Sequence, residues 1–152
     1  MSVYKHKSHN VSVIMYHIVC PVKYRRIIFE KEKYDNSLKE ICLEISKRYE
    51  ITFIEIGTEE DHVHFLVQSA PSYSPSKIVQ IIKSIIAKQM FKKHPEIKKK
   101  LWGGEFWSKG YFLNTVGQYS NEEAIKMYIK NQGKKGEYNR LHKIEQLKLF
   151  DI

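Results

Sequence analysis

Cysteine is scarce in this chain, which has only Cys20 and Cys42 among its 152 residues. Two cysteines so far apart form neither a C-x-x-C pair nor a disulfide framework, so we expect two small buried hydrophobic side chains in a reducing compartment. Glycine and proline are also few, at 7 and 4 residues, while apolar residues make up 42% of the chain and charged residues 28%. These proportions exclude collagen-like, low-complexity and largely disordered chains.

Long apolar runs are missing as well. No stretch of about 18 apolar residues occurs, and residues 1–10 carry Lys5 and Lys7 where a secretory signal would need an apolar segment. We therefore expect a cytoplasmic protein. A chain of this length buries roughly 70% of its unfolded surface, and the sequence shows neither a repeat nor a linker. It predicts a single domain over residues 1–152, with a flexible tail over about 134–152.

Acidic residues are absent from the first 29 positions, although the whole chain has 17 of them. Lysine and arginine number 26, which gives a net charge of +9. The basic residues concentrate in residues 1–29 and 71–110, whereas residues 30–61 are net acidic. Two basic segments that converge on one face attract a polyanion by releasing its counterions. This distribution favours a nucleic acid as the partner.

Hydrophobic periodicity divides the chain into strands and helices. Strands are indicated by runs that are apolar on both sides or rich in β-branched and aromatic residues. Helices are indicated by apolar residues at helical spacing and by N-capping residues at Ser74 and Ser120. The predicted elements are strand 11–20, helix 34–49, strand 51–56, strand 62–68, helix 75–94, strand 106–116 and helix 120–133.

The order of these elements is strand, helix, strand, strand, helix, strand, with residues 57–61 as the turn of a central hairpin. Such a chain forms a ferredoxin-like (RRM-like) antiparallel sheet with both long helices on one face. The predicted fold class is therefore α+β, with the extra helix 120–133 at the C-terminal end. The open face of such a sheet is where many nucleic-acid modules bind.

The segment Asp61-His62-Val63-His64 begins the second strand of the hairpin. Residues two apart in a strand point to the same face, about 6.5 to 7 Å apart, so the two histidines can converge on one metal ion. Asp61 is placed to accept the outer ring N–H of a ligand and fix its tautomer. Alternatively, both histidines are polar residues on a solvated face. The other histidines, His17 among them, lack a partner at ligand spacing and stay unassigned.

Tyr128 and Gln132 lie four residues apart on the predicted C-terminal helix, so they share one face. A tyrosine beside a bound cation can lose its proton and attack a phosphodiester. The Gln132 carbonyl is a hard oxygen ligand that suits Mg²⁺ or Mn²⁺. Packing is the more common role of a lone tyrosine. Zinc is disfavoured because no cysteine stands at ligand spacing to His62 or His64.

Together these residues resemble a known family, the single-tyrosine HUH transposases of small insertion sequences (TnpA type, IS-two-hundred-like). His62-Val63-His64 is similar to the family's histidine-hydrophobe-histidine motif, and Tyr128 and Gln132 stand where its nucleophile and third metal ligand stand. Plasmid relaxases and replication initiators share the histidine motif, but they are usually larger and often place their tyrosines before the histidines or in pairs. Further similarity occurs in segments 23–25, 101–102, 106–107 and 110–117, so the match covers nearly the whole chain.

The resemblance implies an enzyme that transfers strands of single-stranded DNA. Tyr128 would attack the scissile phosphate to form a 5′-phosphotyrosine and a free 3′-OH, with His62, His64, Gln132 and Mg²⁺ or Mn²⁺ polarising the phosphate. No nucleotide cofactor is needed, because the covalent link retains the phosphodiester energy. The resemblance also implies recognition of hairpins near the element ends, and a homodimer in which the tyrosine helix of one subunit completes the active site of the other.

Basic side chains are candidates for phosphate contacts, although an exposed lysine-rich face is as often simply solvated. The candidates are Lys5, Lys7, Lys23, Arg25, Arg26, Lys77, Lys83, Lys88, Lys92 and Lys93, with the run 98–100 beyond them. Trp102, Phe106 and Trp107 are candidates for base stacking, with core packing as the more common role. Two other functions fit the pattern: a non-catalytic module that binds single-stranded DNA or RNA, and a domesticated HUH endonuclease acting on repeat hairpins.

Overall fold

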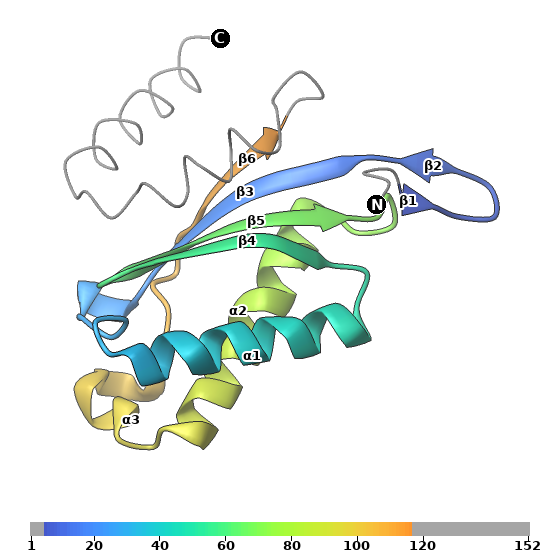
Figure 1. The fold of residues 1–152 in the computed structure, drawn as a ribbon. Helices are drawn as coiled ribbons and strands as arrows, with labels where there is room; N and C mark the ends of the chain where they lie inside the picture. Colours follow the sequence, from blue (N-terminus) through green and yellow to red (C-terminus); the bar gives the residue numbers. More distant parts are fainter. Residues whose placement is uncertain (1–4, 117–152) are drawn as a thin grey trace, which may run out of the picture.

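The computed structural model describes residues 5–116 of the chain (Figure 1). The predicted helix 120–133, with Tyr128 and Gln132, and the predicted tail lie outside these residues. The described elements are β1 (Lys5–His6), β2 (Val11–Ser12), β3 (Ile14–Pro21), the 3₁₀ turn η1 (Lys23–Arg25), α1 (Glu32–Arg48), β4 (Thr52–Glu59), β5 (His62–Ser69), α2 (Pro75–Lys93), α3 (Ile97–Lys100), the 3₁₀ turn η2 (Trp102–Gly104) and β6 (Phe112–Val116).

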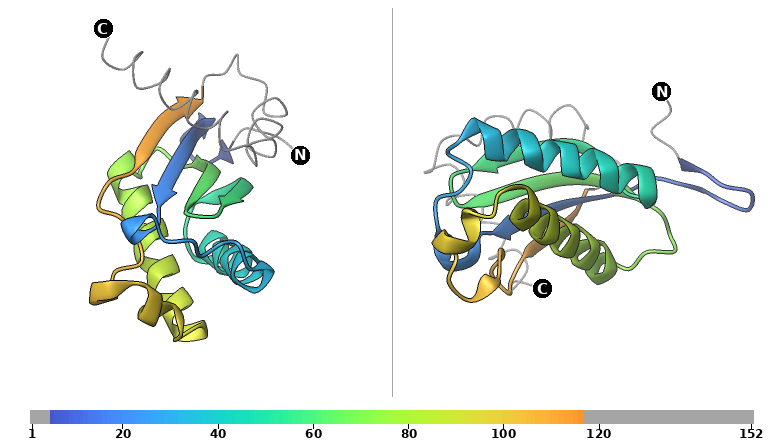
Figure 2. Two further views of the ribbon diagram at one scale, coloured as in Figure 1. Left: turned by 90° about the vertical axis from the view of Figure 1, so that its left-hand side faces the viewer. Right: turned by 90° about the horizontal axis from the view of Figure 1, so that it is seen from below.

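Four of the described strands form one antiparallel sheet in the order β4-β5-β3-β6. In this order each long helix links two strands that are separated by a third, because α1 joins β3 to β4 across β5, and α2 joins β5 to β6 across β3. Both long helices cover the same face of the sheet (Figures 1 and 2). The predicted α+β class with an antiparallel sheet is therefore confirmed. No helix of residues 5–116 is long and apolar enough to cross a membrane.

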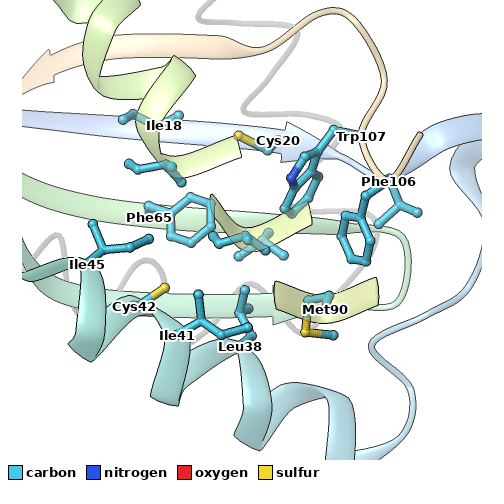
Figure 3. Close-up of a cluster of buried hydrophobic side chains, with 14 of the residues drawn as sticks. Ile18, Cys20, Leu38, Ile41, Cys42, Ile45, Phe65, Met90, Phe106 and Trp107 are labelled. Atoms are coloured by element: carbon cyan, nitrogen blue, oxygen red, sulfur yellow. The ribbon is translucent and has the colours of Figure 1, made fainter. Parts of the chain in front are cut away.

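The core lies between the sheet and the two helices (Figure 3). Strand alternation sends Val63, Phe65 and Val67 of β5 into this layer, where all three are fully buried. From α1, helical spacing brings Leu38 and Ile45 against them. Burial of each large apolar side chain contributes about 1.5 to 3 kcal/mol. Because Val63 and Phe65 face the core, the residues between and before them face the other side of the sheet.

The last predicted strand is shorter in the structure than in the sequence pattern. It begins at Phe112 instead of residue 106, because Phe106 and Trp107 pack in the core with 1% and 6% of their surface exposed. Core packing, the alternative to base stacking, is thus confirmed for these two aromatic residues. The first predicted strand is also divided, since β2 ends at Ser12 and pairs with β1 in a small separate hairpin.

The edge strand β4 extends further than predicted and contains an irregularity. It continues to Glu59, so the hairpin turn is shorter than the predicted segment 57–61. Its register with β5 shifts between Phe53 and Glu55, which are paired with the consecutive residues Val67 and Leu66. One extra residue is therefore accommodated as a β-bulge.

Candidate functional site

β5 places His62 and His64 on the face of the sheet opposite α1 and α2. The intervening Val63 belongs to the core under the helices, and strand alternation turns its two neighbours the other way. Both imidazoles are buried, with 4% and 1% of their surface exposed. Their ring centroids are 5.1 Å apart, with the ring planes at 69°. The alternative of two histidines on a solvated face is therefore wrong.

Asp61 holds His62 from one side. Nδ1 of His62 donates to Oδ1 of Asp61 at 2.7 Å, and Nε of Arg25 donates to Oδ2 at 3.0 Å. Burial raises the pKa of the Asp61 carboxyl, but the hydrogen bonds from His62 and Arg25 outweigh burial, so this pKa lies below its ordinary value. The charged carboxylate keeps the proton of a neutral His62 on Nδ1, which puts the lone pair on Nε2.

His64 is held by His17, a residue to which the sequence pattern assigns no role. Nε2 of His17 lies 2.9 Å from Nδ1 of His64, and the two rings stack with centroids 5.2 Å apart and 14° between their planes. In the sheet register, Val19 pairs with His64 and His17 pairs with Leu66. His17 and His64 are therefore diagonal neighbours on one face, within reach of ring side chains. Alternation along β3 was the only sequence signal, and it carries no information about the register with β5.

The two histidines suit coordination of one divalent cation through their Nε2 atoms. A histidine binds a metal through a ring nitrogen without a proton, and the hydrogen bonds to Asp61 and His17 engage both Nδ1 atoms. Coordination at Nε2 of His64 requires that its Nδ1–H donates to Nε2 of His17. Within residues 5–116, no group of three or more His, Cys, Asp or Glu could hold a metal. The predicted third ligand, Gln132, lies outside the described part of the chain.

The basic candidates have different surroundings. On α2, Lys77, Lys88 and Lys92 are exposed. Ion pairs join three other candidates to acidic residues: Lys7 to Glu50, Lys23 to Glu105, and Lys93 to Glu40. Lys5 lies in β1. Arg25 and Arg26 line a surface pocket together with Lys99 and Lys100, so the structure brings these residues of the two basic segments together.

Lys83 has a different environment from the other lysines of α2. Its ammonium group donates to the backbone carbonyl oxygens of Ser108, Lys109 and Gly110, at 2.7, 3.4 and 3.3 Å. In the same region, Nε1 of Trp107 donates to the carbonyl oxygen of Lys83 at 3.1 Å. Burial lowers the pKa of the Lys83 ammonium. Lys83 thus fixes the irregular segment that leads into β6.

A family model shows where these features belong. The model of the IS200-like transposases matches residues 10–132 of this chain. The match includes both histidines of β5, their neighbours Asp61 and His17, and the positions of Tyr128 and Gln132. The chain belongs to the IS200-like transposase family. As such, this transposase is an enzyme that cuts and rejoins DNA.

Individual relatives agree with this assignment. The ISDra2 transposase TnpA of Deinococcus radiodurans is 33% identical over 117 residues, which cover 77% of this transposase and 82% of that protein. The transposase for insertion sequence element IS200 of Salmonella typhimurium is 32% identical over 117 residues, or 77% and 75% of the two chains.

Two solved structures have a similar fold. A crystal structure of a protein assigned as a transposase from Deinococcus radiodurans R1 aligns with a TM-score of 0.67 at 29% identity, covering 84% of this transposase and 97% of that chain. A REP-associated tyrosine transposase bound to a REP hairpin aligns with a TM-score of 0.51 at 11% identity, covering 85% and 68%. At that identity, the second likeness concerns the fold alone.

Proposed function

We propose that this transposase cleaves and rejoins single-stranded DNA at a metal site formed by His62 and His64, with Tyr128 as the nucleophile, and so moves a small insertion sequence. The observation that supports the proposal most directly is the pair of buried imidazoles, whose Nδ1 atoms face Asp61 and Nε2 of His17. With a proton on Nδ1 of both rings, Nε2 of each ring is the nitrogen that would bind the metal ion.

Mg²⁺ or Mn²⁺ held by His62, His64 and Gln132 would act as a Lewis acid on the scissile phosphate. The hydroxyl oxygen of Tyr128 attacks the phosphorus and loses its proton, the bond to the 3′ oxygen breaks, and that oxygen leaves as a 3′-OH. The resulting 5′-phosphotyrosine keeps the energy of the phosphodiester, so attack by another 3′-OH restores the DNA strand and releases Tyr128. The cycle therefore uses no nucleotide cofactor.

The partners we propose are DNA hairpins near the ends of the element and a second copy of this chain. The REP-associated tyrosine transposase, a protein of similar fold, has been solved with a REP hairpin, which supports a structured single strand as the substrate. In the proposed homodimer, Tyr128 of one subunit completes the active site that contains His62 and His64 of the other subunit.

A covalent-adduct assay tests the nucleophile. The full chain is incubated with single-stranded DNA from its own locus, and adducts are resolved on a denaturing gel. We expect the wild type and a matched Tyr119→Phe variant to form the adduct, and Tyr128→Phe to bind DNA without forming it. An adduct that survives in Tyr128→Phe contradicts the assignment. A wild type that binds DNA but never forms an adduct would favour a non-catalytic binding module.

The metal is tested separately. Chelation should abolish cleavage by the wild type, and added Mg²⁺ or Mn²⁺ should restore it. His64→Ala should stay inactive after the same addition, because the ligand itself is lost. Full cleavage in the presence of a chelator excludes the proposed mechanism.

A further inference from the structure

The turn η1 and the short helix α3 lie at the end of the sheet where β3 finishes and β5 starts (Figure 2). A pocket of about 530 Å³ is lined by residues of both elements. The described residues that line it are Tyr24, Arg25, Arg26, Ile27, Lys99 and Lys100. Its volume falls in the range of about 300 to 1,000 Å³ that is typical of small-molecule sites. The pocket is therefore large enough for a nucleotide unit.

Cationic side chains dominate this pocket. Of the six lining residues that the structure describes, four are arginine or lysine. They come from two parts of the sequence that are far apart, since Arg25 and Arg26 follow β3, whereas Lys99 and Lys100 end α3. Such a concentration of positive charge attracts a polyanion. Arg25 uses Nε for its bond to Asp61, which leaves its terminal guanidinium nitrogens as further donors.

Tyr24 gives the pocket an aromatic surface in an unusual backbone conformation. Tyr24 and Arg25 both have positive φ, at 58° and 53°. For residues other than glycine this conformation costs of the order of 1 kcal/mol or more and often occurs at functional sites. The turn is held by hydrogen bonds from the backbone N–H of Lys23 to Phe106 and from that of Arg25 to Val22, both 2.9 Å long.

The result of this turn is an exposed ring beside the cations. Tyr24 keeps 57% of its surface exposed. Lys23 lies over the ring, with Nζ 5.3 Å from the ring centroid. The exposed ring surface can stack on a flat ligand, and an aromatic surface next to a basic groove is the combination that binds single-stranded nucleic acids.

We propose that this pocket binds one nucleotide of the single DNA strand next to the cleavage site, with its base stacked on Tyr24 and its phosphates contacted by Arg26, Lys99 and Lys100. This inference rests on the proposed function for the identity of the strand. Arg25 lines the pocket and also bonds to Asp61, which bonds to His62. The bound nucleotide therefore lies two side chains from the proposed metal site. An unpaired base is required, because the bases of a duplex are already stacked.

The phosphate contacts are tested by binding in the presence of a chelator, where no cleavage occurs. The probe is a short labelled oligonucleotide, offered to the full chain as a single strand or as a duplex. Lys99→Ala/Lys100→Ala should weaken single-strand binding by about tenfold or more near 0.1 M salt, and reduce the slope of log K against log salt by about 1.4. Lys39→Ala/Lys47→Ala on α1 removes the same charge from side chains that are 52% and 72% exposed, and should leave the slope nearly unchanged.

The stacking contact is tested by Tyr24→Asn, because asparagine tolerates positive φ but has no ring. This variant should lose about tenfold in affinity for the single strand and little for the duplex. Tyr111→Asn is the control, since Tyr111 is a 45% exposed tyrosine that does not belong to the described lining of the pocket. Circular dichroism and thermal unfolding establish that each variant is folded.

The outcomes distinguish a failure of the proposed nucleotide pocket from a failure of the proposed cleavage by Tyr128. If the pocket variants bind single strands as the wild type does, or if the wild type prefers the duplex or binds neither probe, the inference is wrong. The adduct assay decides the proposed function independently, because it reports on Tyr128 whatever the binding variants do. Retained binding by Lys99→Arg/Lys100→Arg, combined with loss in the alanine pair, supports a phosphate contact by charge.

Discussion

Nε2 of His17 and Nδ1 of His64 lie 2.9 Å apart across the neighbouring strands β3 and β5. When Nδ1–H of His64 donates across this contact, Nε2 of His64 is the nitrogen left to bind a ligand. Because His17 is 6% exposed and His64 is 1% exposed, little water competes for this hydrogen bond. We therefore expect His17 to act as a positioning residue for the proposed metal site.

His17→Phe keeps an aromatic ring at this position but removes the acceptor for Nδ1–H of His64. We expect the affinity for Mn²⁺, measured by calorimetric titration of the folded protein, to fall about 10- to 100-fold. His17→Gln should recover part of this loss, because its side-chain oxygen can accept the same hydrogen bond. His6→Phe, a change at an exposed histidine of β1, is the control. Unchanged affinity in His17→Phe contradicts the positioning role.

Lys83→Met retains most of the aliphatic side chain but removes the ammonium that binds three backbone carbonyls. We expect a loss of roughly 1 kcal/mol in the free energy of unfolding, since one part-buried and two exposed carbonyl oxygens lose a charged donor. Urea denaturation measures the loss, and Lys88→Met on the exposed side of α2 should change stability by less than about 0.5 kcal/mol. Equal effects of the two substitutions would show that the carbonyl contacts contribute little.

The two cysteines should be chemically inert in the folded protein. Burial raises the pKa of Cys20 from 9.0 to about 12, and burial also raises the pKa of Cys42. Neither thiol forms the reactive thiolate near neutral pH. Iodoacetamide at pH 8 should therefore modify both cysteines in denaturant and neither in buffer, as measured by mass spectrometry. Rapid labelling of the native protein would contradict the buried environment.

The same pKa shifts predict a pH dependence of stability. Above pH 9 the thiol of Cys20 ionises in the unfolded chain, whereas it stays protonated in the folded state until about pH 12. Proton loss then favours unfolding, so the free energy of unfolding should decrease as the pH rises through this interval. Cys20→Ala should show a smaller decrease in urea titrations across the same interval. An equally steep decrease in that variant would assign the effect to other groups.

Subunit complementation tests the proposed sharing of the active site. His64→Ala and Tyr128→Phe are each expected to be inactive, but a mixed dimer has one site with intact histidines from one chain and an intact tyrosine from the other. After subunit exchange, about a quarter of the wild-type cleavage should return if mixing is random. If mixed dimers form without cleavage, the histidines and the tyrosine of one site come from the same chain.

The sequence pattern correctly predicts which residues share a strand face or a helix face, because these features depend on local periodicity. The spacing of His62 and His64 puts them on one strand face whatever the rest of the fold does, and the apolar spacing of the helices fixes which side is buried. The contact of His17 with His64 depends instead on the register between β3 and β5, which is set by the packing of the whole sheet. The residue pattern of one β-strand contains no information about its register with a neighbouring strand.

In the segment from 106 to 111, the sequence pattern predicts a strand that the structure does not form. Phe106 and Trp107 have high β-propensity, so the pattern predicts a strand, but both side chains pack in the core instead. Their position depends on partners from other elements, such as the carbonyl of Lys83 that accepts from Trp107. Tertiary contacts outweigh the local propensity here. The turn at Tyr24, which has positive φ, also has a tertiary contact, since the backbone N–H of Lys23 donates to the carbonyl oxygen of Phe106.

The bulge in β4 has a consequence for the behaviour of the protein at high concentration. An edge strand exposes backbone donors and acceptors that can recruit a strand from another molecule. The register shift between Phe53 and Glu55 interrupts this row and increases the local twist. This side of the sheet is therefore protected against the strand addition that starts aggregation.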